Sequence, residues 1–201
     1  MKTVAITGTT RGIGLSLKQK MIRQFNVLDL NRPTFDLGIP STINNIDLST
    51  VDVLVLNAGL ANKNLIPNNF RDQDVDYWRN IISTQVIGNF MLMQNYLKVR
   101  DNGVIVVLSS VVVEQSRFSG RAVYTAAKTA LSTMIDELSH EIKRTKQNIR
   151  LIEIRPGLTR DPGETPADGE DRIPTTYDQV ADAIMFAIDH PTMTKVTFNN
   201  L

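Results

Sequence analysis

The chain has 201 residues, which is enough for one domain with a sizeable hydrophobic core. Its formal net charge of +1 gives no overall field that would attract nucleic acid or a membrane surface, and no apolar run approaches the roughly 20 residues of a membrane span. It contains no cysteine, which excludes a disulfide framework and thiolate chemistry, and its 2 histidines form no cluster with metal-ligand spacing, so no metal is expected.

Strand-like apolar runs and helical patterns alternate along the chain. The first run, residues 3–7, leads through a glycine-rich turn into an amphipathic helix over 13–24, and a second strand is predicted at 25–31. Residues 33–50 have room for no more than a short strand near 34–37 and a short helix. The rest of the chain continues the alternation, with strands predicted at 51–57, 103–110, 148–156 and 195–199 and helices at 74–99, 122–146 and 177–189.

Because the predicted strands are continuous apolar runs separated by helices, they indicate a parallel sheet covered on both faces. The sequence therefore predicts one α/β domain over residues 1–201, with a doubly wound parallel sheet of about seven strands. Ligands bind beyond the carboxyl ends of the strands in such sheets. Among the turns expected there, residues 158–176 are rich in Gly, Pro, Asp and Thr and are predicted to form a mobile flap over the site; a solvated surface loop is the alternative.

The stretch "TGTTRGIG" (7–14) places three glycines between the first strand and the first helix. The start of a helix offers free N–H groups and a partial positive charge, which suit a pyrophosphate. Glycines let the backbone turn tightly and come close to the phosphates. On its own, this turn is explained equally well by a tight strand-to-helix connection that binds nothing.

Four later stretches change that balance, namely "LNAG" (56–59), "SS" (109–110), "YTAAK" (124–128) and "RPG" (155–157). In this order, and together with the glycine turn, they resemble the short-chain dehydrogenase/reductase family over nearly the whole chain. The resemblance implies a Rossmann fold and a nicotinamide-dependent oxidoreductase that interconverts a carbonyl and an alcohol.

The pair Tyr124 and Lys128 carries the expected chemistry. The two residues are four positions apart on a helix and therefore share a face. A nearby ammonium favours the phenolate and lowers the pKa of a phenol from its usual value of about 10. We therefore assign Tyr124 as the proton donor to a substrate carbonyl and Lys128 as the residue that tunes it. The resemblance adds that Lys128 holds the ribose hydroxyls of the nicotinamide nucleotide.

The resemblance gives Ser110 the task of hydrogen-bonding the reacting oxygen. The family commonly has this serine thirteen residues before the tyrosine, whereas Ser110 lies fourteen before Tyr124. A one-residue insertion after the serine explains the difference, and Ser109 is the alternative.

Gln85 is a second departure from the family pattern. The family usually has Asn in an N-x-x-G pattern on the long helix, where it completes a proton relay through water, and this chain has "QVIG". The relay asparagine acts largely through its main-chain carbonyl, which Gln85 also provides. The alternatives are a preserved relay, a weakened relay and an ordinary helix residue.

The resemblance assigns cofactor contacts to the glycine turn, the strand ends and the catalytic helix. Asn57, Ala58 and Gly59 are expected to line the cofactor floor, and Thr159 to meet the nicotinamide carboxamide through its backbone. The full set is Gly8, Thr10, Arg11, Gly12, Ile13, Gly14, Asn31, Arg32, Asp36, Leu37, Asn57, Ala58, Gly59, Tyr124, Lys128, Pro156, Gly157 and Thr159.

The end of the second strand indicates which cofactor is preferred. An acid there binds the adenine ribose of NAD(H), whereas an arginine accommodates the 2′-phosphate of NADP(H). Without a gap, Asn31 takes the acid position and Arg32 follows it, with Arg11 as a second phosphate contact. This favours NADP(H). If the strand ends early, Asp29 becomes the acid and NAD(H) is preferred instead.

The leading interpretation is thus an NADP(H)-dependent enzyme acting on a small carbonyl or alcohol. A dinucleotide-binding redox sensor with weak or no turnover is the alternative. A cytoplasmic location is expected, with no nucleic-acid or membrane partner. A homodimer or homotetramer is expected, because the family pairs its two longest helices, here 74–99 and 122–146. Both helices carry apolar residues beyond one sheet-facing stripe, namely Tyr77, Ile81, Met91 and Met134.

Overall fold

The computed structural model describes residues 1–59, 70–114, 120–161 and 173–198. In these residues a central sheet of six strands runs in the order β2-β1-β3-β4-β5-β8, and every neighbouring pair is parallel. The strands are β1 (Thr3–Thr7), β2 (Asn26–Leu30), β3 (Val53–Leu56), β4 (Asn102–Leu108), β5 (Asn148–Arg155) and β8 (Lys195–Thr197). The prediction of a single doubly wound α/β domain is confirmed.

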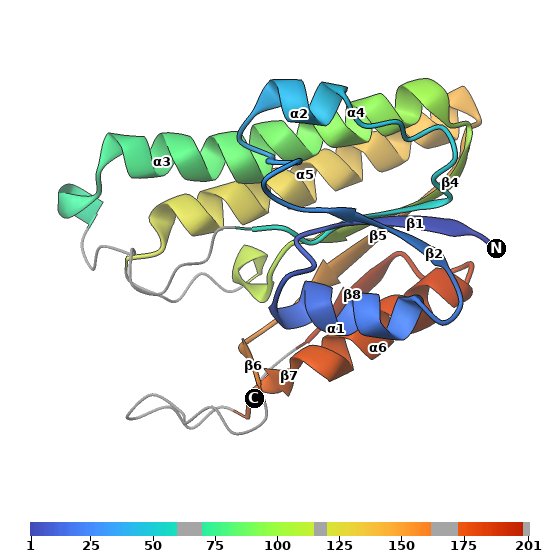
Figure 1. Cartoon of the computed structure of the whole chain (residues 1–201). Coiled ribbons are helices and arrows are strands. Elements are labelled where there is room, and N and C mark those ends of the chain that lie inside the picture. The colour runs from blue at the N-terminus through green and yellow to red at the C-terminus, as the bar shows by residue number, and fades with distance from the viewer. Residues whose placement is uncertain (60–69, 115–119, 162–172, 199–201) are drawn as a thin grey trace.

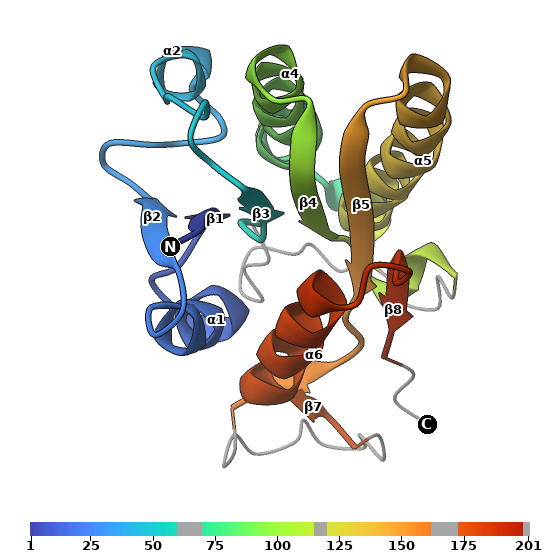
Figure 2. The same cartoon turned by 90° about the vertical axis from the view of Figure 1, so that its right-hand side faces the viewer.

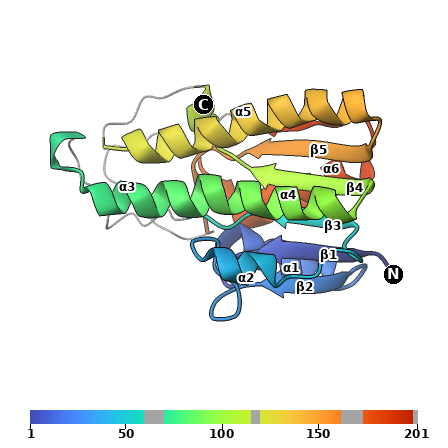
Figure 3. The ribbon, with the colours of Figure 1, turned by 90° about the horizontal axis from the view of Figure 1, so that it is seen from above.

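Helices cover both faces of this sheet, which gives three layers (Figures 1 and 2). One face carries α2 (Pro40–Asn44), α4 (Asn89–Val99) and α5 (Ala122–Thr145). The other carries α1 (Gly12–Met21) and α6 (Tyr177–Asp189), which pack against each other. Seen from above, the long helices run side by side over the strands (Figure 3).

The apolar runs of the strands serve two separate cores. On β4, Ile105 and Val107 belong to the core beneath α4 and α5, whereas Val106 and Leu108 belong to the core beneath α1 and α6. Successive side chains of a strand point to opposite faces, so a strand buried on both faces must be apolar throughout. This is the physical reason why the unbroken runs predicted strands correctly.

The predicted short strand near residues 34–37 is not formed, which is why the sheet has six strands in the described residues rather than about seven. The segment closes successive turns instead: Phe35 N–H donates to the Asn31 carbonyl, and Asp36 Oδ1 accepts from Gly38 N–H at 2.8 Å. Phe35 and Leu37 fill the core below α4. Consequently β2 is an edge strand of the described sheet.

The helix predicted over 74–99 consists of three consecutive pieces. These are α3 (Val75–Ile82), a π-helical segment η3 (Ser83–Gly88) and α4. A β-carbon on Gly88 would lie 2.2 Å from the Leu37 carbonyl oxygen, so glycine allows the turn after β2 to reach this helix. Wider π-helical turns are often found at functional sites, and Gln85 lies within this one.

Four short elements complete the described structure, and the first is a 3₁₀ turn, η2 (Phe70–Asp72), before α3. A 3₁₀ turn, η4 (Val111–Val113), follows β4, and the two-residue strands β6 (Thr159–Arg160) and β7 (Thr175–Thr176) pair in parallel. Most of the flap expected at 158–176 lies outside the described residues. In the described part of the chain, no helix is both long and apolar enough to cross a membrane.

Candidate active site

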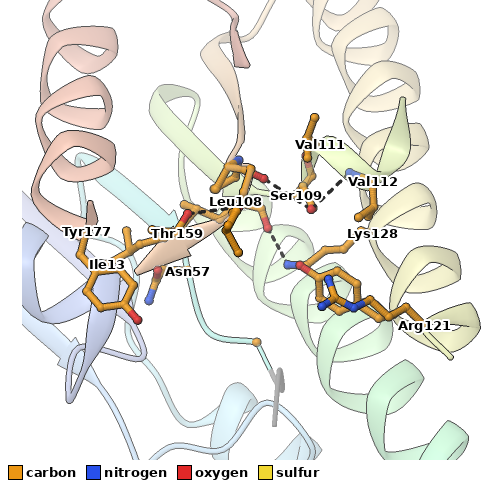
Figure 4. Close-up of a pocket in the computed structure, with 16 residues that line it drawn as sticks. Ile13, Asn57, Leu108, Ser109, Val111, Val112, Arg121, Lys128, Thr159 and Tyr177 are labelled. Carbon is orange, nitrogen blue, oxygen red and sulfur yellow. Dashed lines mark hydrogen bonds between the residues drawn. The ribbon is translucent and has the colours of Figure 1, made fainter. Parts of the chain in front are cut away.

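A cavity of about 340 Å³ opens at the carboxyl ends of the central strands, near the point where the strand order reverses (Figure 4). Open α/β sheets bind ligands at this place. The lining comes from the glycine turn, the ends of β3, β4 and β5, and the starts of α5 and α6. The lining residues are Ile13, Asn57, Gly59, Leu108, Ser109, Ser110, Val111, Val112, Arg121, Tyr124, Lys128, Pro156, Gly157, Leu158, Thr159 and Tyr177. The structure thus gathers many of the predicted site residues around one space.

The three glycines of the turn have distinct physical roles. Gly8 and Gly12 adopt positive φ angles of 72° and 58°, which side chains of L residues rarely allow. Gly14 has an ordinary φ, but a β-carbon there would lie 2.0 Å from the Gly8 carbonyl oxygen. The turn therefore needs glycine twice for its backbone angles and once for close packing of α1 on the end of β1.

Thr7 and Asn57 hold the turn in place. The Asn57 side-chain amide donates to the carbonyls of Thr7 and Gly8 at 3.0 and 2.9 Å. The Thr7 hydroxyl accepts from the N–H groups of Asn57 and Ala58 at 3.0 and 2.9 Å. Besides lining the cavity, Asn57 therefore ties the end of β3 to the glycine turn after β1.

The strand β2 does not end early, because its last residue is Leu30. Asn31 follows it directly and exchanges hydrogen bonds with Thr9 at 2.8 and 2.7 Å. Asp29 lies within the strand and accepts from the Thr9 hydroxyl at 2.8 Å and from Lys18. Asp29 is therefore not the residue that follows the strand, which was the condition for it to take the acid position.

Other predicted cofactor residues near this edge lie outside the cavity lining. The Arg32 side chain is 73% exposed and 3.6 Å from Asp36, and Thr10 and Arg11 are exposed on the glycine turn. The Leu37 side chain is buried in the core, so it cannot flank an adenine as expected. At Leu37, only the backbone is available to contact an adenine.

Ser110, and not Ser109, lies against Tyr124. The Ser110 side chain acts to lower the pKa of the Tyr124 phenol, and its hydroxyl donates to the Pro156 carbonyl at 3.5 Å. The Ser109 hydroxyl instead donates to the buried Glu153 carboxylate at 2.6 Å. The structure thus distinguishes two adjacent serines that the sequence left as alternatives.

Tyr124 and Lys128 lie close together, but the ammonium does not bond the phenol. Lys128 Nζ is 5.8 Å from the centroid of the Tyr124 ring and donates to the Leu108 carbonyl at 2.8 Å (Figure 4). Burial raises the pKa of the Tyr124 phenol, while the Ser110 hydrogen bond and the Arg121 charge act to lower it. Burial also lowers the pKa of Lys128 from 10.5 to about 8. The expectation that Lys128 lowers the phenol pKa is therefore not met by the protein alone, because desolvation dominates.

Gln85 lies behind the cavity floor and is fully buried. A β-carbon on Gly59 would lie 3.5 Å from Gln85 Oε1 and 3.7 Å from Lys128 Nζ, so the Gln85 and Lys128 side chains both reach this glycine. The main-chain carbonyl of Gln85 accepts a hydrogen bond from the Asn89 side chain at 2.8 Å. Asn89, which falls out of register with the family pattern, thus contacts the carbonyl in question.

Six residues of the lining were missed by the sequence analysis: the apolar Leu108, Val111, Val112 and Leu158, and the polar Arg121 and Tyr177. Tyr177 begins α6, and its ring would lie 3.7 Å from a β-carbon on Gly12. Arg121 directly precedes α5, three residues before Tyr124, and that spacing was the available signal for it. Nothing in the sequence around Tyr177 indicates a contact with a turn so far away along the chain.

A cluster of charged side chains lies behind Ser109, and Glu153 and Arg155 at its centre are buried. Arg155 bonds Glu153 at 2.9 Å, Glu114 at 2.5 Å and the Ser132 hydroxyl at 2.8 Å, and Lys195 lies 3.2 Å from Glu153. Burial raises the pKa of the Glu153 carboxyl, but bonds from Arg155 and Ser109 outweigh burial and hold it below its usual 4.5. Glu153 therefore remains a buried, compensated carboxylate that anchors the end of β4.

Comparison with known families and proteins agrees with this geometry. The family model for short chain dehydrogenases matches residues 39–170. An uncharacterized oxidoreductase of Staphylococcus epidermidis is 24% identical over 223 residues, covering 97% of this chain and 94% of that protein. The resemblance noted in the sequence is confirmed.

Solved structures share the fold at low sequence identity. A 4-hydroxyisoleucine dehydrogenase complexed with NADH superposes with a TM-score of 0.84 at 22% identity, covering 100% of this chain and 98% of that one. A short chain dehydrogenase from Burkholderia cenocepacia in complex with NADP gives a TM-score of 0.81 at 18% identity, covering 98% and 96%. The likeness extends over the whole length of both chains and supports the fold assignment.

Replacing Glu153 tests the buried charge cluster. Glu153→Gln leaves Arg155 without its buried charged partner, and we expect a loss of about 3 kcal/mol in the free energy of unfolding at pH 7, measured by urea denaturation. The matched control is Glu114→Gln, which removes the same charge from a side chain that is 40% exposed and should cost less than about 1 kcal/mol.

The effect of Glu153→Gln on the free energy of unfolding should depend on pH. The folded-state pKa of Glu153 lies below 4.5, so its stabilising contribution is present above that value and is lost as the pH falls through the folded-state pKa. The stability difference between the wild type and Glu153→Gln should therefore shrink in acid. Equal losses for Glu153→Gln and Glu114→Gln at pH 7 would contradict this account.

Replacing Lys128 tests the cost of its buried charge. Because its folded-state pKa is about 8 rather than 10.5, the folded protein is penalised below pH 8, and the penalty disappears as the pH rises toward 10.5. Lys128→Met should raise the free energy of unfolding at pH 7, without added cofactor, by about 1–3 kcal/mol after allowing for the lost hydrogen bond. Lys143→Met, an exposed change on the same helix, should do little. A less stable Lys128→Met protein would refute the prediction.

Proposed function

The chain belongs to the short-chain dehydrogenase family of oxidoreductases, and we propose that it uses NADP(H) to interconvert a carbonyl and an alcohol on a small molecule. The observation that carries the proposal is the meeting of Ser110, Tyr124 and Lys128 in one cavity beside the glycine turn. These groups supply a hydrogen-bond donor, a phenol and an ammonium around a space where a carbonyl oxygen can lie.

The turn at the start of α1 suits a dinucleotide. Gly8 and Gly12 keep its backbone free of side chains, and α1 begins there with its free N–H groups directed outward. Similar structures are described with NADH and with NADP. When bound, the nicotinamide would supply or accept the hydride. The residues proposed to hold the cofactor are those of the glycine turn, the floor residues Asn57 to Gly59, Lys128 and the wall from Pro156 to Thr159.

Side chains of the protein supply the proton that the carbonyl oxygen receives. In the reducing direction Tyr124 gives its phenolic proton to the carbonyl oxygen, and Ser110 donates a hydrogen bond to the same oxygen. The Lys128 ammonium, 5.8 Å from the centroid of the Tyr124 ring, supplies a positive charge near the phenolate that remains after the transfer, without bonding it. Burial lowers the pKa of Lys128 to about 8, so the ammonium is still its main form at pH 7.

Preference for NADP(H) over NAD(H) rests on the residues after β2. Arg32 is exposed at the turn that would face an adenine ribose, and Arg11 is exposed on the neighbouring glycine turn. Asp29, the acid that would favour NAD(H), is engaged by Thr9 and Lys18. An exposed arginine beside an engaged acid favours a 2′-phosphate over a free hydroxyl.

A redox sensor that binds the dinucleotide but turns over slowly is the rival function. The bond from Asn89 to the Gln85 carbonyl favours it, because that carbonyl is the group on which the family's proton relay depends. A carbonyl has two lone pairs, so the bond weakens the relay without abolishing it. Cofactor oxidation at 340 nm with a panel of carbonyl compounds separates an enzyme from a sensor.

Assembly into a cytoplasmic homodimer, or a homotetramer built from such dimers, is part of the proposal. Ile87 and Phe90, about half exposed, form an apolar pair on the helix that begins as α3 and ends as α4. Ile81, expected to be available for such an interface, is instead buried against α5 within the chain. The dimer contact is therefore proposed for Ile87 and Phe90, together with the outer face of α5.

Arg32→Ala tests the cofactor preference. Charge-assisted hydrogen bonds contribute about 1.5–3 kcal/mol each, so NADPH affinity should fall at least about tenfold while NADH affinity changes little. Fluorescence titration with both cofactors provides the measurement, and Arg144→Ala at the far end of α5 is the matched control. Equal losses for both cofactors would overturn the assignment.

Tyr124→Phe tests the chemistry, because it removes only the hydroxyl. Reductase activity should fall by about 10²–10⁴-fold, the usual contribution of a positioned general acid. Cofactor binding should change by less than about 1 kcal/mol. Tyr77→Phe, outside the cavity lining, should leave both unchanged. Full activity in Tyr124→Phe would rule out the mechanism.

Light scattering at tens of micromolar tests the assembly. The wild type should be a dimer or tetramer, and Phe90→Glu should weaken the proposed contact because it places a charge in an apolar interface. Phe186→Glu on α6, the opposite side of the sheet, is the control for a general effect of added charge. A monomeric wild-type protein would contradict the proposal.

A further inference from the structure

Arg121 brings a second positive charge to the wall that carries Tyr124. It directly precedes α5 and lies three residues before Tyr124, so both side chains lie on the same side of the helix start. Its half-buried side chain lines the cavity on the same side as Lys128 (Figure 4). The Arg121 charge acts on the phenol, where it opposes the effect of burial on the Tyr124 pKa.

The charges of the described lining are of one sign. Arg121 and Lys128 are the charged residues among the lining side chains that the structure describes, and both are basic. Lys128 Nζ donates to the Leu108 carbonyl at the cavity wall. Val111 and Val112 add apolar surface to the same side of the cavity. A ligand group that meets Arg121 therefore gains most if it is anionic and attached to a short, weakly polar body.

One side of the cavity is proposed to hold the cofactor, and the opposite side the substrate. Figure 4 shows Ile13, Asn57 and Tyr177 on one side and Arg121, Lys128 and Val112 on the other. The first side carries the glycine turn proposed to bind the cofactor phosphates. Arg121 lies on the opposite side of the cavity, which also carries the proton donor Tyr124. The reacting oxygen of the substrate must lie on that side, because it accepts the proton.

We propose that Arg121 binds a carboxylate of the substrate, so that the reaction interconverts a small oxo acid and the corresponding hydroxy acid. This inference rests on the proposed function. A guanidinium presents two parallel N–H donors that match the two oxygens of a carboxylate. In the reducing direction the carbonyl carbon gains a hydride from the reduced cofactor and the oxygen gains the Tyr124 proton. The carboxylate is unchanged, and its task is to orient the neighbouring carbonyl.

Matched acid and ester substrates provide the test. Pyruvate, 3-oxobutanoate and 4-oxopentanoate place the carboxylate at increasing distance from the carbonyl, and their methyl esters remove the charge alone. For the best pair, the wild type should prefer the acid at least about tenfold in kcat/KM, the low end of what a charge-assisted bond contributes. Arg121→Gln should lower that acid-to-ester ratio at least about tenfold, and Arg121→Lys, which keeps the charge but loses the paired donors, should lie between.

Arg144→Gln, an exposed change at the far end of α5, is the control and should keep the wild-type ratio. The ester rate within each variant corrects for any effect of Arg121 on the Tyr124 phenol. If Arg121→Gln lowers the acid and ester rates equally, Arg121 acts through Tyr124 and the inference is wrong. It is also wrong if Arg121→Gln weakens NADPH binding about tenfold in the absence of substrate.

A binding experiment separates failure of this inference from failure of the proposed function. Calorimetry with the protein and NADP⁺ compares lactate, 3-hydroxybutanoate and 4-hydroxypentanoate with their methyl esters. Arg121-dependent binding of an acid supports the inference even if no carbonyl is reduced. Acids that bind no tighter than esters overturn it, while reduction of neutral carbonyls would still support the proposed function.

Discussion

The candidate site depends on the contact between the ends of β1 and β3. These strands are neighbours where the sheet order reverses, and Thr7 and Asn57 join their ends through backbone and side-chain hydrogen bonds. The contact leaves no room for a side chain on Gly14, whose β-carbon would lie 2.0 Å from the Gly8 carbonyl oxygen. The contact between the two strand ends fixes the position of the glycine turn relative to Gly59. It therefore sets the shape of the cavity on the proposed cofactor side.

Two kinds of buried charge surround the cavity and have opposite effects on stability. The carboxylate of Glu153 is compensated by Arg155 and Ser109, so it secures the end of β4 behind the candidate serine. Lys128 is buried beside the cavity with its pKa lowered to about 8, which is a cost to the folded protein. A ligand that brings negative charge to the cavity would offset this cost, so binding and stability are coupled through this one side chain.

The alternation of apolar runs and helices was sufficient to predict the layers of the fold, because burial on both faces requires apolar residues on both sides of every strand. The segment 34–37 shows where this reasoning failed. Its apolar residues Phe35 and Leu37 enter the core through turns, which a short apolar run cannot distinguish from a strand. The helix over 74–99 was predicted as one element, whereas a π-helical segment interrupts it and ends at Gly88, which packs closely against the turn after β2.

By itself, the sequence determined which residue types stand at the strand ends and which of them recur at helical spacing, because these properties depend on neighbours along the chain. The glycine turn and the spacing of Tyr124 and Lys128 belong to this class. Tertiary structure alone decided that Ser110 faces the phenol while Ser109 faces the core, and that Tyr177 reaches the glycine turn. The direction of each of these side chains is set by groups far away in the sequence, such as Glu153, and spacing along the chain does not contain that information.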